Sequence, residues 1–178
     1  LRQLGAQIEW VENEGYPPLH TQAFQDSNLP QIELSGKISS QYLTGLLMGL
    51  PQLNREISIK IYDELISRPY VEITLELLKL FGAKAAETSP NCFTIYPIES
   101  LQAVEYTVEP DASSASYFLA LGAMRGQVQI NHLSATSLQG DKNFARVLAQ
   151  MGAEVEYNAD NIVVRSQALN AININMED

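Results

Sequence analysis

Two serine-containing segments have the residue types and the spacing to bind an anion. Each stands at the start of a predicted helix, where backbone N–H groups lack partners and the helix dipole is positive. Serine hydroxyls would add further donors, so two such helix starts could hold one phosphate or carboxylate between them. The alternative is that these serines only cap their helices, because serine is a favoured N-cap residue. The segments are Ser39-Ser40-Gln41 and Ser67-Arg68-Pro69-Tyr70.

The other residues that could take part in chemistry have simpler structural interpretations. Residues 111–116 open a third predicted helix, and we interpret them as its N-terminal cap. The single cysteine, Cys92, and the two histidines, His20 and His132, are too few for a zinc site built from such residues. A glycine-rich GxxxxGK[ST] loop is absent from the sequence, so P-loop nucleotide chemistry is not expected in this segment.

A repeat of about 70 residues supplies the elements that would position the serines. The first copy predicts a strand at 31–34, a helix at 40–50, a strand at 56–62, a helix at 69–81, and strands at 84–88 and 92–96. The second predicts a strand at 104–108, a helix at 113–125, a strand at 127–133, a helix at 141–151, and strands at 154–157 and 162–165. Strands that alternate with helices in this way predict an α/β fold of repeated βαβαββ units.

The two ends of the chain resemble parts of the same repeat. Residues 1–22 have the pattern of its last helical turn and final strand pair, and residues 171–176 alternate like the first strand of a further unit. We therefore expect the chain to be an internal fragment of a longer protein. Residues 42–50 and 113–125 are apolar on most sides, which predicts buried helices.

Charge and composition limit the classes of partner. The formal net charge is −10, from 11 basic and 21 acidic side chains. Nucleic-acid binding needs a basic face, so we expect no nucleic-acid partner. Neither a transmembrane run nor a leader is visible, so we expect no membrane partner. The lone cysteine fits a reduced, cytoplasmic setting.

Five segments, in matching order and spacing, resemble the enolpyruvylshikimate-phosphate (EPSP) synthase family. They are residues 15–19 (GYPPL), 39–48 (SSQYLTGLLM), 67–75 (SRPYVEITL), 111–120 (DASSASYFLA) and 139–141 (QGD). The resemblance covers essentially the whole chain. It implies the enolpyruvyl transferase fold, an inside-out α/β barrel in which both domains are built from βαβαββ units, here incomplete.

The resemblance also implies a domain organisation. Residues 1–110 would form the later part of the first, shikimate-phosphate-binding domain, with one full unit at about 31–97. Residues 111–178 would start the second domain, with one unit at about 104–166 and the first strand of the next.

The same resemblance implies an activity and the residues that serve it. Family members transfer the enolpyruvyl group of phosphoenolpyruvate to the 5-hydroxyl of shikimate 3-phosphate, in aromatic amino acid biosynthesis, and need no metal or organic cofactor. Ser39, Ser40 and Ser67 resemble the serines that hold the 3-phosphate group. Gln41 resembles the glutamine beside the substrate ring and phosphoenolpyruvate, and Tyr70 resembles the tyrosine that lines the shikimate pocket.

The family's catalytic residues are expected outside this segment. Its Lys-Ser, Asn-Ala-Gly-Thr and Arg-Pro motifs would precede Leu1, and the aspartate of its Ile-Pro-Asp motif would follow Asp178. General acid–base catalysis needs such groups within hydrogen-bond reach, so we expect the isolated piece to be inactive. The full-length enzyme is expected to be monomeric, whereas exposed apolar surface on the piece predicts self-association.

Two other functions remain open. The sibling enzyme that transfers enolpyruvyl to UDP-N-acetylglucosamine shares the fold, but is not expected to combine Ser-Ser-Gln with Ser-Arg-Pro-Tyr and Asp-Ala-Ser-Ser-Ala. A non-catalytic α/β repeat module would use the same serines as helix caps. In that case, substitution of Ser39, Ser40 or Ser67 would change no ligand affinity.

Overall fold

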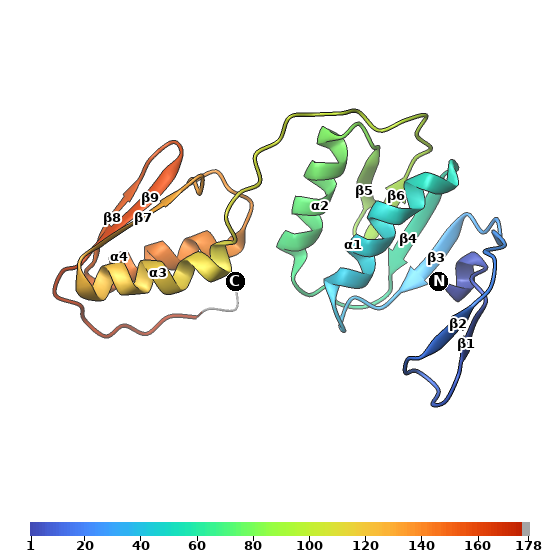
Figure 1. Cartoon of the computed structure of the whole chain (residues 1–178), viewed down its shortest axis with the longest axis horizontal. Helices are drawn as coiled ribbons and strands as arrows, with labels where there is room; N and C mark the ends of the chain where they lie inside the picture. Colours follow the sequence, from blue (N-terminus) through green and yellow to red (C-terminus); the bar gives the residue numbers. More distant parts are fainter. Residues whose placement is uncertain (176–178) are drawn as a thin grey trace. The chain divides into compact units, whose positions relative to one another are not determined.

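The structure, a computed structural model, describes residues 1–175 (Figure 1). The chain divides into two units, Leu1–Val104 and Glu105–Asp178, and each is described by itself. The domain boundary expected near residue 110 stays a prediction. Within residues 1–175, helices long and apolar enough to cross a membrane are absent.

A four-stranded sheet forms the centre of the first unit. Across the sheet the order is β3 (Gln31–Leu34), β4 (Ile57–Ile61), β6 (Cys92–Ile95) and β5 (Ala85–Ser89). β3 runs parallel to β4, whereas β6 runs antiparallel to β4 and β5. The isoleucines of β4 are all buried and alternate with Ser58 and Lys60, as the period of two in the sequence predicts.

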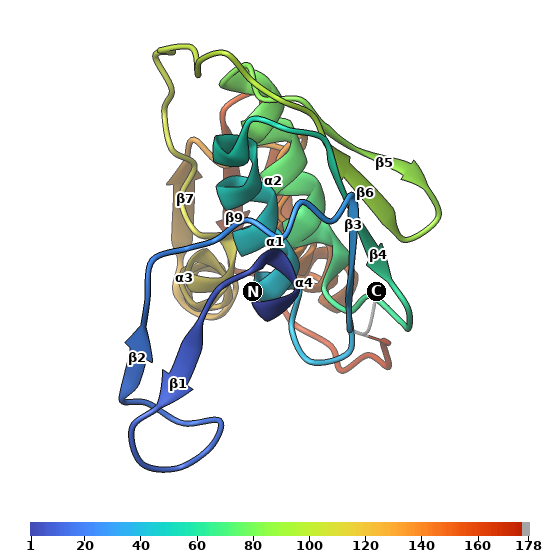
Figure 2. The same cartoon turned by 90° about the vertical axis from the view of Figure 1, so that its right-hand side faces the viewer.

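Two helices cover one face of this sheet (Figures 1 and 2). α1 (Ser40–Gly49) continues into the 3₁₀ turn η2 (Leu50–Leu53), and α2 (Arg68–Leu80) packs beside α1. The order β3–α1–β4–α2–β5–β6 confirms the predicted βαβαββ unit. The core between helices and sheet includes Leu43, Leu47 and Val71 from the helices and Ile57, Ile59, Phe93 and Ile95 from the strands.

An N-terminal segment precedes this sheet. It consists of the 3₁₀ turn η1 (Arg2–Leu4) and an antiparallel hairpin of β1 (Ile8–Trp10) and β2 (Leu19–Thr21). The hairpin extends away from the four-stranded sheet (Figure 2). The Arg2 guanidinium lies over the Trp10 ring, 4.2 Å from its centroid, which joins η1 to the hairpin by a cation–π contact.

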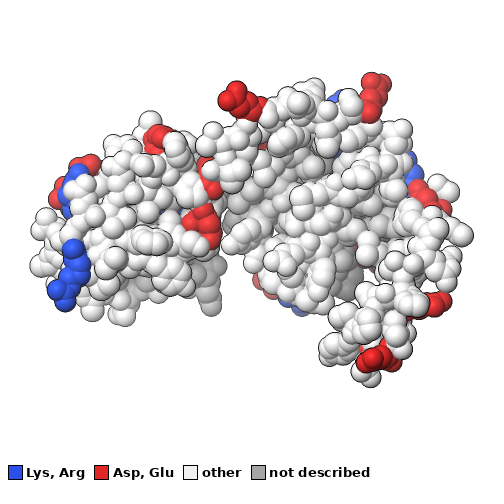
Figure 3. Space-filling model, viewed as in Figure 1, with Lys and Arg blue, Asp and Glu red and all other residues white. Residues whose placement is uncertain are grey.

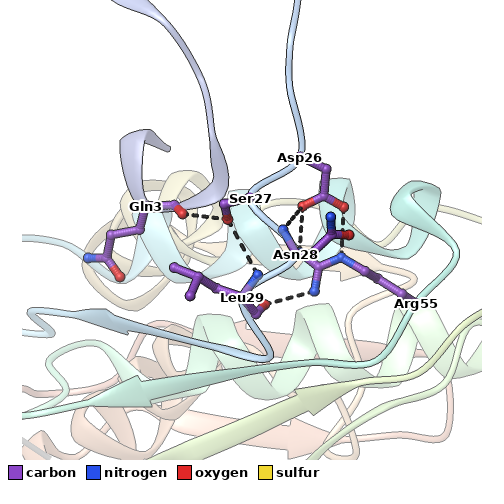
Figure 4. Close-up of polar contacts among 6 residues, drawn as sticks. All are labelled: Gln3, Asp26, Ser27, Asn28, Leu29 and Arg55. Atoms are coloured by element: carbon purple, nitrogen blue, oxygen red, sulfur yellow. Dashed lines mark hydrogen bonds and ion pairs between the residues drawn. The ribbon is translucent and has the colours of Figure 1, made fainter.

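Arg55 fastens the chain after the hairpin to the turn that leads into β4 (Figure 4). Its Nε and Nη2 atoms donate to the two carboxylate oxygens of Asp26, each at 2.7 Å, and its Nη1 atom donates to the Leu29 carbonyl at 2.8 Å. The paired hydrogen bonds from Arg55 are the main reason why the pKa of Asp26 is lowered. Such a two-pronged pairing fixes orientation as well as distance.

Gln3 fastens the N-terminus to the outer edge of β3. Its Nε2 atom donates to the Glu33 carbonyl at 3.0 Å, and its Oε1 atom accepts from the Glu33 N–H at 2.9 Å. The Ser27 hydroxyl donates to the Gln3 carbonyl at 2.7 Å (Figure 4). The Gln3 carboxamide therefore occupies both backbone groups of a residue in an edge strand.

The second unit has a three-stranded antiparallel sheet with two helices on one face (Figure 1). The strand order is β7 (Gln127–Asn131), β9 (Asn161–Arg165) and β8 (Glu154–Tyr157). The helices are α3 (Ala112–Arg125) and α4 (Phe144–Met151), which follows the 3₁₀ turn η3 (Gly140–Asn143). Its core is separate from that of the first unit and includes Leu119, Ala123, Leu133, Leu148, Ile162 and Val164.

Two strands expected from the sequence do not form in the second unit. Residues 104–108 are not a strand. Ser137 donates to the Glu109 carboxylate, and Gln139 donates to both Glu109 and the Pro110 carbonyl. These hydrogen bonds hold residues 109–110, which directly follow the expected strand, against residues 137–139. Residues 171–175 are not a strand either. Met176 lies outside the described residues.

α1 and α3 are less buried than predicted. Tyr42 and Met48 of α1, and Tyr117, Phe118 and Met124 of α3, are each more than half exposed. A helix in a two-layer unit has a sheet against one side only, so its opposite side stays open. The self-association expected from such surface stays a prediction.

Asp111 caps α3, as interpreted from the sequence. Its carboxylate accepts from the backbone N–H groups of Ser113 and Ser114. The Ser114 hydroxyl, together with these N–H groups, lowers the pKa of Asp111. The ionised carboxylate is therefore the form that stabilises the folded state.

We expect Asp111→Ala to lower the melting temperature at neutral pH and to have little effect in acid. The folded pKa lies below the unfolded value of about 3.9, so the contribution is present above that value and is lost as the pH falls through the folded pKa. Thermal unfolding between about pH 7 and pH 2 tests this linkage. Glu105→Ala, which removes an exposed carboxylate of the same unit, is the control. A difference that stays constant over the whole range would contradict the assignment.

Candidate functional site

The parallel pairing of β3 and β4 brings the two serine segments together. Parallel strands end at the same edge of a sheet, so the loops that follow them begin side by side. The loop after β3 leads into α1 at Ser40, and the loop after β4 leads into α2 at Arg68. Both helix N-termini therefore face the space beyond that edge.

A cleft of about 360 Å³ lies at these helix N-termini. All the site residues predicted from the sequence line it. Sequence reasoning missed Thr44, Ile73 and Thr74, although spacings of three and four residues from Gln41 and Tyr70 place them on the same helix faces. The complete lining is Ser39, Ser40, Gln41, Thr44, Ser67, Tyr70, Ile73 and Thr74.

Ser39 and Ser67 precede their helices in different backbone conformations. Ser39 is extended, and its Oγ atom accepts from the Gln41 N–H at 3.1 Å, so it caps α1. Ser67 is left-handed, with φ 53° and ψ 42°, and its side chain does not cap α2. A left-handed residue other than glycine costs roughly 1–2 kcal/mol, and such strain is common at functional positions. The conformation leaves the Ser67 hydroxyl available to a ligand.

Several polar groups of the cleft have no hydrogen-bond partner within residues 1–175. They are the hydroxyls of Ser40, Ser67 and Tyr70 and the carboxamide of Gln41. The hydroxyls of Thr44 and Thr74 donate to carbonyls one turn back, at 3.2 and 2.8 Å, so their oxygens can still accept. The cleft thus offers neutral donors. One of them, Ser40, is buried, with 4% of its surface exposed.

The nearby charged side chains are not part of the lining. Arg68, at the first position of α2, pairs with Glu72 and with Glu87 of β5. Lys37 is exposed and does not line the cleft. Acidic side chains are spread over both units on the face shown in Figure 3. The donors that this lining offers to an anion are therefore neutral side chains and helix N-termini.

The other candidate residues of the sequence lie outside this cleft. His20 is exposed on β2, and His132 pairs with Asp160, with 3.1 Å between Nδ1 and Oδ2. Cys92 begins β6 and is partly buried. Groups of His, Cys, Asp and Glu that could hold a metal ion are absent from the described part of the chain. None of these residues assembles with the serines.

The family model described as EPSP synthase (3-phosphoshikimate 1-carboxyvinyltransferase) matches residues 1–178. The chain belongs to the EPSP synthase family. This membership confirms the resemblance on which the sequence interpretation rested, and it makes the transferase class and the shikimate pathway the family context of the cleft.

Curated EPSP synthase relatives align with nearly the whole chain. The 3-phosphoshikimate 1-carboxyvinyltransferase of Actinobacillus pleuropneumoniae serotype 5b (strain L20) is 42% identical over 179 residues, which cover 99% of this chain and 41% of that protein. The enzyme of the same name from Shewanella woodyi (strain ATCC 51908 / MS32) is 44% identical over 178 residues, covering 99% and 42%. The chain therefore spans about two-fifths of the length of these relatives.

Solved structures confirm the enolpyruvyl transferase fold in incomplete form. The EPSP synthase from Acinetobacter baumannii matches with a TM-score of 0.72 at 24% identity, over 98% of this chain and 40% of that one. The enolpyruvyl transferase NikO from Streptomyces tendae matches with a TM-score of 0.65 at 18% identity, over 93% and 40%. At these identities the likeness to the EPSP synthase structure and to NikO concerns the fold alone.

Proposed function

We propose that this chain is part of a 3-phosphoshikimate 1-carboxyvinyltransferase and that its cleft binds the 3-phosphate group of shikimate 3-phosphate. The observation that carries the proposal is the pair of helix N-termini that β3 and β4 hold at one sheet edge, with serines at both. Phosphate oxygens accept hydrogen bonds, and this cleft offers hydroxyl and backbone donors. At a net charge of −10, such local donors must outweigh an unfavourable overall field.

Each polar residue of the cleft has a role in this proposal. The hydroxyls of Ser39, Ser40 and Ser67 donate to the phosphate oxygens. The Gln41 carboxamide lies beside the substrate ring and phosphoenolpyruvate, and Tyr70 lines the shikimate pocket. Phosphoenolpyruvate is thus the second substrate, and the enzyme needs no metal or organic cofactor.

The proposed reaction joins the two substrates and releases phosphate. In the net reaction, the 5-hydroxyl oxygen of shikimate 3-phosphate bonds to C2 of phosphoenolpyruvate, the C2–O bond to phosphate breaks, and the hydroxyl proton ends on the released phosphate. The cleft lining has no carboxylate, lysine or histidine that could move this proton. This part of the enzyme accordingly supplies substrate binding, and the piece alone is inactive.

The proposal extends to the organisation of the whole enzyme. Residues 1–110 belong to the shikimate-phosphate-binding domain, and residues 111–178 begin the second domain. The full-length enzyme acts as a monomer in the cytoplasm.

We expect calorimetry on the full-length protein to show binding of shikimate 3-phosphate and none of UDP-N-acetylglucosamine. The serine segments that line the cleft resemble those that hold shikimate 3-phosphate, and the enzyme that uses UDP-N-acetylglucosamine is not expected to combine them. Adding phosphoenolpyruvate to the complex should then release inorganic phosphate. Binding of UDP-N-acetylglucosamine in preference would contradict the proposed substrate. Binding of neither ligand, without turnover, would favour a non-catalytic module in which Ser39 only caps α1.

A further inference from the structure

The loops that carry the two serine segments are joined by one carboxylate. Asp63 lies in the loop between β4 and α2. Its carboxylate accepts from the Ser35 hydroxyl and from the Gly36 N–H, both at 2.6 Å and both in the loop between β3 and α1. Asp63 is the side chain that ties the two loops to each other.

The backbones of the same loops are also in direct contact. Ile66 donates its N–H to the Gly36 carbonyl at 3.3 Å. A Cβ atom at Gly36 would lie 2.6 Å from the Glu64 carbonyl oxygen and 2.8 Å from the Leu65 Cα atom, so only glycine fits there without backbone movement. The two loops are therefore closely packed at Gly36, which is also one of the two residues that the Asp63 carboxylate contacts.

These contacts lie next to the phosphate-binding serines in the chain. Ile66 directly precedes Ser67, and Gly36 comes shortly before Ser39. A change in the distance between the two loops would therefore change the spacing of the donors at the two helix N-termini. Donors to a phosphate must match its geometry, and misplacement by about 1 Å can cost a large factor in binding or rate.

We propose that Asp63 is a positioning residue for shikimate 3-phosphate, because its two hydrogen bonds to Ser35 and Gly36 hold the helix starts at Ser39 and Ser67 at the spacing of one phosphate group. This inference rests on the proposed function of the cleft. Asp63 does not line the cleft, so it would act through the residues that do. Its own donors, chiefly the Ser35 hydroxyl, lower the pKa of Asp63 and keep it in the ionised form that accepts both bonds.

Steady-state kinetics of the full-length enzyme test the role of Asp63. We expect Asp63→Ala to raise the KM for shikimate 3-phosphate about tenfold and to leave the KM for phosphoenolpyruvate within about twofold. Asp63→Asn keeps one acceptor for the Gly36 N–H, so it should recover part of the loss. Glu64→Ala is the matched control, since Glu64 is the next carboxylate in the loop and is exposed.

A double-mutant cycle makes the test specific to the joined loops. Ser35→Ala should raise the KM for shikimate 3-phosphate as well. The double variant Asp63→Ala/Ser35→Ala should raise this KM by less than the product of the two single increases, because both changes break the same Ser35–Asp63 hydrogen bond. Equal increases in both KM values, or a lower melting temperature without any change in KM, would overturn the positioning role.

The proposed function and the positioning role fail in distinguishable ways. Wild-type enzyme without turnover of shikimate 3-phosphate refutes the function, and the positioning role with it. If the wild-type enzyme is active and Ser67→Ala impairs it, but Asp63→Ala does not, only the positioning role is refuted.

Discussion

Replacement of Ser67 by alanine is expected to weaken shikimate 3-phosphate binding by about 10- to 100-fold without loss of stability. A hydrogen bond to a charged group contributes about 1.5–3 kcal/mol, and each 1.4 kcal/mol is a factor of ten in affinity. Ser67 does not cap α2, and its hydroxyl has no partner within residues 1–175, so the folded state loses no hydrogen bond. Its hydroxyl is available for ligand binding alone.

Ser39 provides the contrasting case at the other helix start. Because Ser39 caps α1, Ser39→Ala should weaken binding and also destabilise the protein by about 1 kcal/mol. The Ser39→Ala/Ser67→Ala double variant should lose binding almost completely. Calorimetric titration with shikimate 3-phosphate, beside thermal unfolding of each variant, separates the two effects.

Two further variants complete the test of Ser67. Ser67→Gly suits the left-handed backbone, so it should abolish the hydroxyl contact at no cost in stability. Ser116→Ala, a partly buried serine of α3 outside the cleft, is the control and should bind like wild type. Unchanged affinity in Ser67→Ala and in the double variant would refute the site and leave Ser39 with its role as the cap of α1 alone.

Truncation of Ile59 to alanine should lower the free energy of unfolding of the first unit by about 2–5 kcal/mol. Ile59 is fully buried in β4, between β3 and β6, and faces the core that α1 and α2 cover. The substitution leaves a cavity in the strand whose end carries the loop to Ser67. Binding of shikimate 3-phosphate should therefore be lost at a lower urea concentration than in wild type.

Lys60→Ala is the matched control for Ile59→Ala. Lys60 is the next residue of the same strand but is exposed, so its loss should change stability by no more than about 0.5 kcal/mol. Urea unfolding followed by circular dichroism compares the two variants. Equal effects would show that β4 is not the centre of this core.

The sequence was sufficient to predict most of the fold because its signals are local. The isoleucines of β4 repeat with a period of two, Gly82 and Gly152 end helices in the left-handed conformation, and Asp111 precedes a helix it can cap. Each of these features depends on neighbours within a few residues. The parallel pairing of β3 and β4 agrees with their strand–helix–strand order.

Features that depend on distant residues could not be predicted in the same way. The strand expected at 104–108 alternates correctly, but a strand also needs a ladder partner, and Gln139 and Ser137 hold the next residues elsewhere. The contact of Asp63 with Ser35 joins residues far apart in the sequence and has no periodic pattern. Periodicity likewise shows that α3 is apolar, but does not show which sides of it a sheet covers.

The pair of hydrogen bonds between the Gln3 carboxamide and the Glu33 backbone has a consequence for aggregation. An edge strand with free backbone groups can pair with a strand of another molecule, which is how amyloid-like growth begins. The Gln3 carboxamide already pairs with the N–H and the carbonyl of Glu33, so an incoming strand would have to displace it. The first turn of the chain thus protects the outer edge of the sheet, and the Glu33 amide should exchange slowly with deuterium although it belongs to an edge strand.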